Sequence, residues 1–338
     1  MTATGVIGAG AWGTALAQML ASDGRAVRLW ARDAGLVGTI NDAHRNPLYL
    51  PDAALSPAIR ATNDLSELAA LDILLVVVPA QHVGTVLGEL SGYGGDLVLC
   101  AKGIEAGSGR LMADVAGDCV PGAGLAVLSG PTFAHEVVAG LPTAVTLACA
   151  GRPGESGEAQ WNRLSAAIAR PQFRPYFSDD MTGAEIGGAV KNVLAIACGV
   201  VDGLSLGQNA RAALIARGYA EMLRFGLARG ARADTLAGLC GLGDLVLTCS
   251  STRSRNFSLG KALGTGQSAA ELMAHRRTVA EGAFTAPVLN ALAHDMGIAM
   301  PITEAVCALL DGRVDAQTMV ERLLSRPLRT ETEPENTV

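Results

Sequence analysis

The chain has 338 residues, enough for two domains, and its 49% apolar and 17% charged residues are typical of a globular protein with a substantial core. A formal net charge of −6 excludes nucleic acid or an anionic membrane as the general partner, so an anionic ligand needs a local basic cluster. Seven cysteines without a CxxC spacing indicate reduced thiols, and neither a disulfide framework nor a metal site.

The start of the chain enters a strand-like run at once, so we expect no signal peptide. No apolar run approaches the ~18 residues of a membrane helix, so we expect no membrane span. With the reduced cysteines, these features predict a cytoplasmic protein.

Residues 3–150 alternate short apolar runs with helix-like segments, and several runs are continuously apolar, as strands covered on both faces are. This alternation predicts a mainly parallel, doubly wound α/β sheet of the Rossmann type. A last strand is expected at Gln172–Phe177. The earlier predicted strands are Gly5–Ile7, Ala26–Trp30, Ile73–Val78, Leu97–Cys100, Leu125–Leu128 and Thr143–Ala148.

From about Asp179 the pattern changes to helices separated by turns, at residues 183–201, 209–229, 268–274, 284–296, 302–310 and 315–324. We therefore predict an α/β NAD(P)-binding domain at residues 1–180 and an all-α substrate and catalytic domain at 181–328. Residues 329–338 are polar, and we expect them to form a disordered tail.

The residues Gly8-Ala9-Gly10-Ala11-Trp12-Gly13 form a GxGxxG motif between a strand-like and a helix-like run, the context that a dinucleotide fingerprint requires. Gly8 would make the tight turn, Gly10 would admit the pyrophosphate close to the backbone, and Gly13 would allow close packing of helix on sheet. The alternative is an ordinary glycine turn, which this context disfavours.

The second strand ends in Arg32 and Asp33, about 20 residues after the glycine motif. An acidic residue there binds the ribose of NAD, whereas an arginine suits the 2′-phosphate of NADP. Asp33 is equally a candidate N-cap of the next helix. We favour NADPH as the cofactor, with NAD as the alternative.

Two further strand ends carry polar residues. Lys102 follows one and is well placed for an anionic group, because ligands of open α/β sheets bind beyond the carboxyl ends of the strands. Ser129–Phe133 follows another and offers backbone N–H groups and hydroxyls. His135 and Glu136 suggest an acid–base pair, but their place at a helix start favours a capping or solvated role.

The segment Ile186–Gly203 is almost entirely small or apolar, yet it carries Lys191 and Asn192. A helix that is apolar on most sides is usually buried, and lysine is seldom buried without a partner or a task. Lys191 is therefore a candidate acid–base group; the alternative is a lysine that reaches the surface past small neighbours. We expect room for cofactor and substrate beside the small residues on its face, which are Gly187, Gly188, Ala195 and Cys198.

Three later positions carry candidate polar groups. Asp244 and Thr248 are four residues apart and share a face if that segment is helical. Arg255 and Asn256 offer a planar fork of donors and an amide, which suit a phosphate; the alternative is a solvated loop. Glu281 is interpreted as a first-turn helix residue.

Several blocks in order resemble the bacterial NAD(P)-dependent glycerol-3-phosphate dehydrogenases, from about residue 4 to 324. The blocks are GAGAWGTALA, NPLYLP, VPAQHV, AKGIE, SGPTFAHEV, GGAVKNVLAIACGVVDGLSLGQNARAALIARG, GLGDLVLTC and SRN. Their order is far more specific than any single motif.

The resemblance implies roles for individual residues. The general acid–base lysine of the family matches Lys191, and we add Thr248, which with Asp244 would orient Lys191 or a hydroxyl. The substrate-binding positions match Lys102, Gly130, Thr132, Asp244, Ser254, Arg255 and Asn256. The cofactor positions match Ala11, Trp12, Arg32, Tyr49, Lys102, Ala134, Arg255, Val279 and Glu281.

The resemblance also implies interconversion of dihydroxyacetone phosphate and sn-glycerol 3-phosphate with NAD(P)H, for phospholipid synthesis. Lys191 would protonate the carbonyl oxygen, with its pKa lowered by burial and by Lys102. The alternatives are another small-substrate dehydrogenase of this architecture and a non-enzymatic NADP(H) sensor. A homodimer formed through the helical half is an expectation with no motif behind it.

Overall fold

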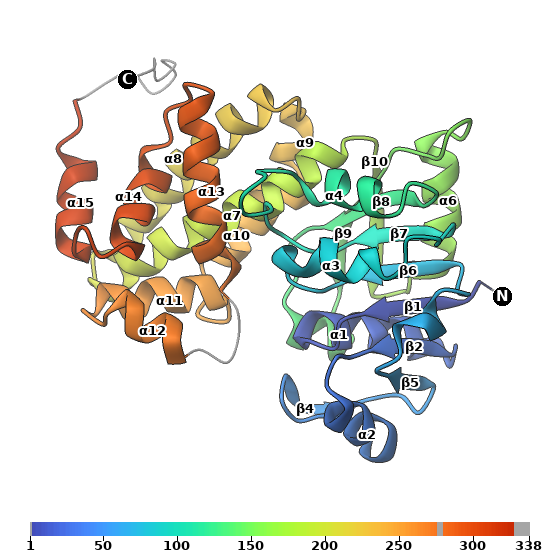
Figure 1. Cartoon of the computed structure of the whole chain (residues 1–338). Coiled ribbons are helices and arrows are strands. Elements are labelled where there is room, and N and C mark those ends of the chain that lie inside the picture. Colours follow the sequence, from blue (N-terminus) through green and yellow to red (C-terminus); the bar gives the residue numbers. More distant parts are fainter. Residues whose placement is uncertain (1, 276–279, 328–338) are drawn as a thin grey trace. The chain divides into compact units, whose positions relative to one another are not determined.

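The computed structural model of the chain describes residues 2–275 and 280–327 (Figure 1). These residues form two compact units. The first contains residues 2–101 and Leu111–Ala184, and the second contains Lys102–Arg110 and the described residues from Glu185 onward. The predicted division at residue 180 therefore differs from the observed grouping at two places: the first unit extends to Ala184, and the segment Lys102–Arg110 groups with the helical residues. The tail predicted at 329–338 lies outside the described residues.

The first unit is built on an eight-stranded sheet with the order β10-β9-β8-β7-β6-β1-β2-β5. Every neighbouring pair is parallel except β8 and β9, which are antiparallel. The predicted doubly wound, mainly parallel sheet is thus confirmed. Its strands are β1 (Thr4–Ile7), β2 (Val27–Trp30), β5 (Ile59–Thr62), β6 (Ile73–Val76), β7 (Asp96–Leu99), β8 (Gly124–Ser129), β9 (Thr143–Cys149) and β10 (Phe173–Ser178).

The central strands are buried on both faces. Every residue of β1, β6 and β7 is buried, which explains why these strands are continuously apolar or nearly so. The edge strand β5 is buried except at Arg60 and was not predicted, because its sequence IRAT contains no continuous apolar run. A two-stranded ribbon, β3 (Arg45–Asn46) and β4 (Leu50–Ala54), was also missed.

The helices of the first unit connect these strands, as the predicted alternation requires. They are α1 (Ala11–Leu20), α2 (Ala34–Ala43), α3 (Val83–Gly88), α4 (Met112–Cys119), α5 (Ala134–Val138) and α6 (Gly157–Ile168), with short turns η1 (Ala21–Asp23), η2 (Leu65–Leu68) and η3 (Ala80–His82). Helix α1 follows β1 directly and packs against α5.

Among its described residues the second unit contains helices joined by turns and loops, and no strand (Figure 1). Each helical segment predicted there coincides with an observed helix to within three residues at either end. The helices are α7 (Met181–Gly203), α8 (Gly207–Ala228), α9 (Ala233–Ala237), α10 (Asp244–Cys249), α11 (Arg255–Gly264), α12 (Ala269–His275), α13 (Glu281–Asp295), α14 (Pro301–Leu310) and α15 (Ala316–Leu324), with one π-helical turn, η4 (Leu239–Gly243).

Helix α7 is the core of this unit. By length and composition alone it would pass as a membrane span, but its apolar window is wholly buried inside the structure, as in a core helix. It approaches α11 at backbone distance, since a Cβ added at Gly260 would collide with the carbonyl oxygen of Ile196. This close packing holds the start of α11 beside the polar residues of α7 that form the candidate site.

Candidate active site

A buried carboxylate, that of Asp244, joins two lysines in the second unit. The Lys191 Nζ donates to Asp244 Oδ1 at 2.6 Å, and the Lys102 Nζ donates to Asp244 Oδ2 at 2.8 Å. Asp244 is fully buried, Lys191 is 5% exposed and Lys102 is half-buried. Together with Thr248 we call these residues the Asp244 cluster. Lys191 is therefore held inside the unit, and the alternative of a lysine reaching the surface is wrong.

Thr248 completes the cluster from the same helix as Asp244. Its hydroxyl accepts from the Lys191 Nζ at 2.9 Å and donates to Asp244 Oδ1 at 3.2 Å. The predicted sharing of a helix face by residues 244 and 248 is confirmed in α10. An ammonium has three N–H donors. Asp244 and Thr248 take two of those of Lys191, so one remains to meet a ligand oxygen.

Burial is the main cause of a lowered pKa for this amine. Burial lowers the pKa of Lys191 to about 8; the Asp244 carboxylate raises it and the Lys102 ammonium lowers it further. Two cations around one carboxylate leave a surplus positive charge when both are protonated. A lysine with this pKa can both donate and accept a proton near neutral pH.

Gly187, one of the small residues beside Lys191, faces protein backbone where room for a ligand was predicted. A Cβ added at Gly187 would lie 2.5 Å from the carbonyl oxygen of Cys240 in η4. Ala195 and Cys198 are completely buried. At Gly187 the missing side chain thus admits protein, because it lets η4 pack against α7. Because η4 leads directly into α10, this contact brings Asp244 to Lys191.

Lysine is rare in this chain, and its rarity marks the residues of the Asp244 cluster. The chain has three lysines, at positions 102, 191 and 261, against 23 arginines. Two of the three lie in the Asp244 cluster. An arginine would supply the same charge but would not release its proton near neutral pH, so lysine is needed where an amine must titrate.

Asn192 is a further functional candidate, to which the sequence pattern assigned no role. Its Nδ2 donates to the carbonyl oxygen of Lys102 at 3.1 Å and to that of Gly188 at 3.2 Å. Its Oδ1 accepts from the Nδ2 of Asn256 at 2.9 Å, and the Oδ1 of Asn256 accepts from the backbone N–H of Gly282 at 3.0 Å. A chain of amides thus connects the Asp244 cluster to α11 and α13.

The first turn of α11 carries the predicted phosphate residues. Ser254 is the N-cap of this ten-residue helix, and its hydroxyl accepts from the backbone N–H of Phe257 at 3.2 Å. Arg255 is exposed and Asn256 is buried. A helix N-terminus with an arginine is a favourable place for an anion. Ser254 therefore has at least a structural task in forming that terminus.

The predicted nucleotide residues of the second unit lie at the start of α13. Glu281 is the first residue of this helix and is half-buried, next to the Gly282 that donates to Asn256. Val279, also predicted to bind the cofactor, lies outside the described residues.

In the first unit the glycine motif has the geometry that the fingerprint requires. Gly8 has a φ of +115°, and a Cβ added there would lie 3.1 Å from the backbone of Val77. A Cβ at Gly13 would collide with the carbonyl oxygen of Gly8, whereas nothing lies within 4 Å of one added at Gly10. Gly8 and Gly13 are thus required by the fold, and Gly10 faces open space at the start of α1.

One buried polar atom tests whether a nucleotide fits there. The indole Nε1 of Trp12 is buried and finds no hydrogen-bond partner among the residues that the structure describes. Trp12 belongs to the first turn of α1, whose leading N–H groups have no acceptor within the helix. An orphaned donor beside a glycine turn fits a phosphate-containing ligand.

Tyr49 reaches this region through a residue that the sequence reasoning missed. The buried side chain of Asn46 donates to Ala9 O at 2.9 Å and to Thr14 Oγ1 at 2.8 Å. Its Oδ1 accepts from the backbone N–H of Tyr49 at 3.2 Å. Asn46 therefore ties the loop that carries Tyr49 to the glycine turn.

The end of β2 shows which use of Asp33 the fold makes. Asp33 is the N-cap of α2, and its carboxylate accepts from the backbone N–H of Leu36 at 2.9 Å. Arg32 is exposed beside it. Of the two alternatives left open for Asp33, capping is the one seen.

The segment after β8 contains the remaining predicted residues. Gly130 is buried at a φ of +150°, and the Thr132 hydroxyl donates to its carbonyl oxygen at 3.2 Å. Ala134 begins α5. The exposed His135 and Glu136 approach each other only to 3.8 Å, in agreement with a solvated role.

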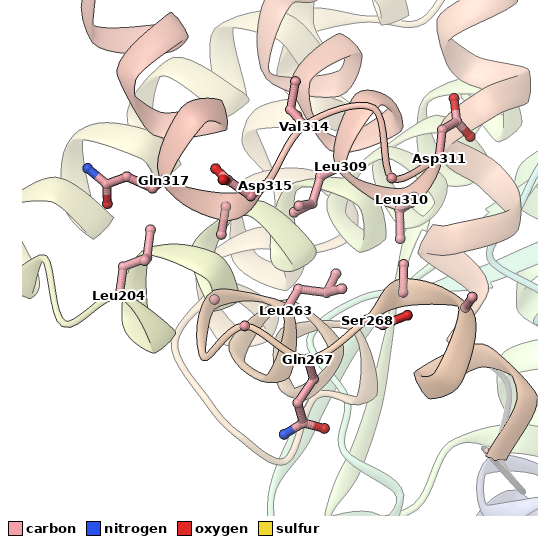
Figure 2. A pocket seen from close by; sticks show the side chains of 16 residues that line it. Leu204, Leu263, Gln267, Ser268, Leu309, Leu310, Asp311, Val314, Asp315 and Gln317 are labelled. Carbon is pink, nitrogen blue, oxygen red and sulfur yellow. The ribbon is translucent and has the colours of Figure 1, made fainter.

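The seven cysteines are free, and over residues 2–275 and 280–327 no group of three or more His, Cys, Asp or Glu side chains could hold a metal ion. A pocket of about 470 Å³ in the second unit is largely aliphatic, with Leu263 and Leu309 projecting into it (Figure 2). No predicted site residue lines this pocket.

Comparison with known proteins gives consistent matches. The N-terminal family model of NAD-dependent glycerol-3-phosphate dehydrogenase matches residues 3–153, and its C-terminal model matches residues 180–321. A glycerol-3-phosphate dehydrogenase (NAD(P)+) of Novosphingobium aromaticivorans is 70% identical over 327 residues, 97% of each chain. The crystal structure of glycerol-3-phosphate dehydrogenase from Coxiella burnetii is 39% identical, with a TM-score of 0.90 over 96% of this chain and 99% of that one. The Saccharomyces cerevisiae enzyme is 27% identical, with a TM-score of 0.81 over 95% of this chain and 98% of that one.

Proposed function

Because this chain belongs to the NAD-dependent glycerol-3-phosphate dehydrogenase family, we propose that Lys191 is its catalytic acid–base group and that the Asp244 cluster receives the substrate carbonyl. The enzyme is an oxidoreductase that interconverts dihydroxyacetone phosphate and sn-glycerol 3-phosphate with NAD(P)H. The known role of the family is to supply phospholipid biosynthesis. The observation that carries the proposal is one buried carboxylate hydrogen-bonded by two lysines.

The bound NAD(P)H supplies the hydride for the ketone carbon. Lys191 directs its remaining N–H at the carbonyl oxygen, stabilises the alkoxide-like charge that develops there, and gives that oxygen its proton. In the reverse direction the neutral amine of Lys191 accepts the proton of the hydroxyl. Asp244 and Thr248 fix the amine, so that its free N–H points one way.

Lys102 has two effects in this scheme. It shares Asp244 and thereby lowers the pKa of Lys191, which prepares Lys191 to release a proton. Its own ammonium adds to the surplus positive charge of the cluster. An anionic substrate compensates that charge, which favours a phosphorylated ketone over an uncharged one.

We assign the substrate phosphate to the first turn of α11. The helix N-terminus, the Arg255 guanidinium and the Asn256 amide offer donors there, and the amide chain through Asn192 connects this turn to the Asp244 cluster. Ser254 supports the turn as its N-cap. Gly130 and Thr132, in the first unit, stay predictions as substrate contacts.

The nucleotide would be held at the glycine turn of the first unit. Gly8, Gly10 and Gly13 shape the turn, and the N–H groups of Ala11 and Trp12 open α1 toward the phosphates. The orphaned Trp12 Nε1 supports this assignment. Contacts of the cofactor with Tyr49, Lys102, Ala134, Arg255, Val279 and Glu281 stay predictions, as do a homodimer and a cytoplasmic location.

The two alternative functions have less support from the structure and the sequence matches. A non-enzymatic sensor has no need of two lysines on one buried carboxylate, where every buried charge costs stability unless it is paired. Another dehydrogenase of the same architecture would share the fold, but a chain 70% identical over 97% of its length to a glycerol-3-phosphate dehydrogenase favours the phosphorylated ketone.

We expect Lys191→Ala to lower kcat for reduction of dihydroxyacetone phosphate by at least ~10²-fold, the usual range for an acid–base group. The measurement is NADPH oxidation at saturating substrate. In the wild type, the descending limb of kcat/KM for reduction should lie near pH 8, and kcat/KM for glycerol 3-phosphate oxidation should rise through the same pH. The two directions differ because one needs the ammonium and the other the amine. A Lys191→Ala enzyme with near-wild-type turnover would remove the assignment.

Arg255→Ala should lower kcat/KM for dihydroxyacetone phosphate by about 10- to 100-fold, the value of one charge-assisted hydrogen bond of roughly 1.5–3 kcal/mol. The slow reduction of unphosphorylated dihydroxyacetone should change little, because that substrate has no phosphate to bind. Arg253→Ala, an exposed arginine two residues away, is the matched control and should leave both rates intact. Equal losses in the two variants would argue against a phosphate contact.

We propose a preference for NADPH, because Asp33 is engaged as an N-cap and Arg32 is the exposed polar group beside it. Arg32→Ala should lower the ratio of kcat/KM for NADPH to that for NADH by about tenfold, since a charge-assisted bond to the 2′-phosphate would be lost. Initial rates with each nucleotide measure the ratio. A ratio that is unchanged by the substitution would contradict this role of Arg32.

A further inference from the structure

The side-chain amide of Asn192 has one orientation that its surroundings permit. Its Nδ2 faces the carbonyl oxygens of Lys102 and Gly188, which only accept hydrogen bonds. Its Oδ1 must therefore accept, and the donor is the Nδ2 of Asn256. The Oδ1 of Asn256 in turn faces the backbone N–H of Gly282, which only donates. Each amide is thus oriented by a backbone group at the far end of the chain of bonds.

The hydrogen bond from Asn192 to the carbonyl oxygen of Lys102 fixes the start of the segment Lys102–Arg110, which follows directly on residues of the first unit. Residues Lys102–Arg110 group with the helical unit, although the residues on either side belong to the sheet unit. The segment is closed on itself by Glu105, which pairs with Arg110 at 3.3 Å. It packs on α13, where a Cβ added at Gly109 would lie 2.8 Å from Leu292. Asn192 holds its first residue, the one that carries the lysine.

This arrangement divides the tasks of two adjacent residues on α7. Lys191 reaches Asp244 with its amine, and Asn192 secures the backbone from which Lys102 reaches the other oxygen of the same carboxylate. Asn192 is 6% exposed, so solvent cannot readily replace its bonds. The Oδ1 of Asn192 accepts from Asn256 and so fixes that side chain in the first turn of α11.

We infer that Asn192 is a positioning residue: it holds Lys102 on Asp244 and orients Asn256, and so sets the charge around Lys191 before substrate binds. This inference rests on the proposed function of Lys191. It assigns to Asn192 no contact with the reacting atoms. Three groups bear electrostatically on Lys191: Asp244 and Cys249 raise its pKa and Lys102 lowers it. Displacement of Lys102 therefore has a predictable direction.

The test is Asn192→Ala in the full-length enzyme, with three readouts. We expect kcat/KM for dihydroxyacetone phosphate to fall about 10- to 100-fold, since two buried carbonyls and the Asn256 amide lose a partner. The descending limb of the reduction profile should move above its wild-type position near pH 8, because Lys102 no longer opposes protonation of Lys191. Combined with Lys102→Ala, the loss should be clearly smaller than the product of the two single losses.

Thr303→Val is the matched control for a general loss of packing. Thr303 is completely buried in the same unit, and its hydroxyl donates to Glu221 Oε2 at 3.1 Å, outside the amide chain. This variant should lower Tm without moving the pH limb. If Asn192→Ala fails to fold, Asn192→Ser, whose short hydroxyl cannot span to both carbonyls, is measured in its place.

The outcomes separate this inference from the proposed function. The positioning role would be overturned if the descending limb of the pH profile does not shift in the Asn192 variant. It would also be overturned if the losses in kcat/KM multiply when the substitution is combined with Lys102→Ala. The proposed role of Lys191 would stand in both cases, because the wild-type limb supports it independently. A wild-type enzyme without a limb near pH 8, or one that tolerates Lys191→Ala, would remove the proposed function itself.

Discussion

The site depends on one buried carboxylate shared by two ammonium groups. Asp244 is completely buried and gives one oxygen to Lys191 and the other to Lys102. Breaking a buried ion pair typically costs about 3–5 kcal/mol, because the remaining charge is left without compensation. The cluster therefore holds α7, α10 and the segment Lys102–Arg110 in one arrangement. Groups held in place in this way need little reorganisation when charge develops on a substrate oxygen.

The backbone packing that permits this cluster is as specific as the cluster itself. Helix α7 carries no side chain at Gly187, so the π-helical turn η4 lies against it and delivers Asp244. The absence of a side chain at Gly260 lets α11 meet α7 in the same way and brings Asn256 within reach of Asn192. Charge placement and small residues thus act together: they bring α10 to the Lys191 amine and α11 to the neighbouring Asn192.

The helix pattern could identify Lys191, because an apolar helix with a single lysine is unusual, and the i,i+4 spacing could pair Asp244 with Thr248. The partners of Lys102 and Asn192 could not be predicted. Lys102 lies 142 residues from Asp244, and the acceptor of Asn192 is a backbone carbonyl, which every residue possesses. The small residues beside Lys191 were assigned to ligand space for the same reason: periodicity gives a face but not its neighbour. The nucleotide motif was predictable because strand, turn and helix are contiguous in sequence.

The most direct measurement uses the fact that the chain has only three lysines. In protein labelled with carbon-13 at the lysine Cε, a pH titration followed by NMR gives one resonance each for Lys102, Lys191 and Lys261. We predict one resonance that titrates near pH 8 and is missing from a Lys191→Met variant, because burial and Lys102 lower the pKa of that amine. Three resonances that all titrate near the ordinary lysine value of about 10.4 would contradict a pre-set acid–base group at Lys191.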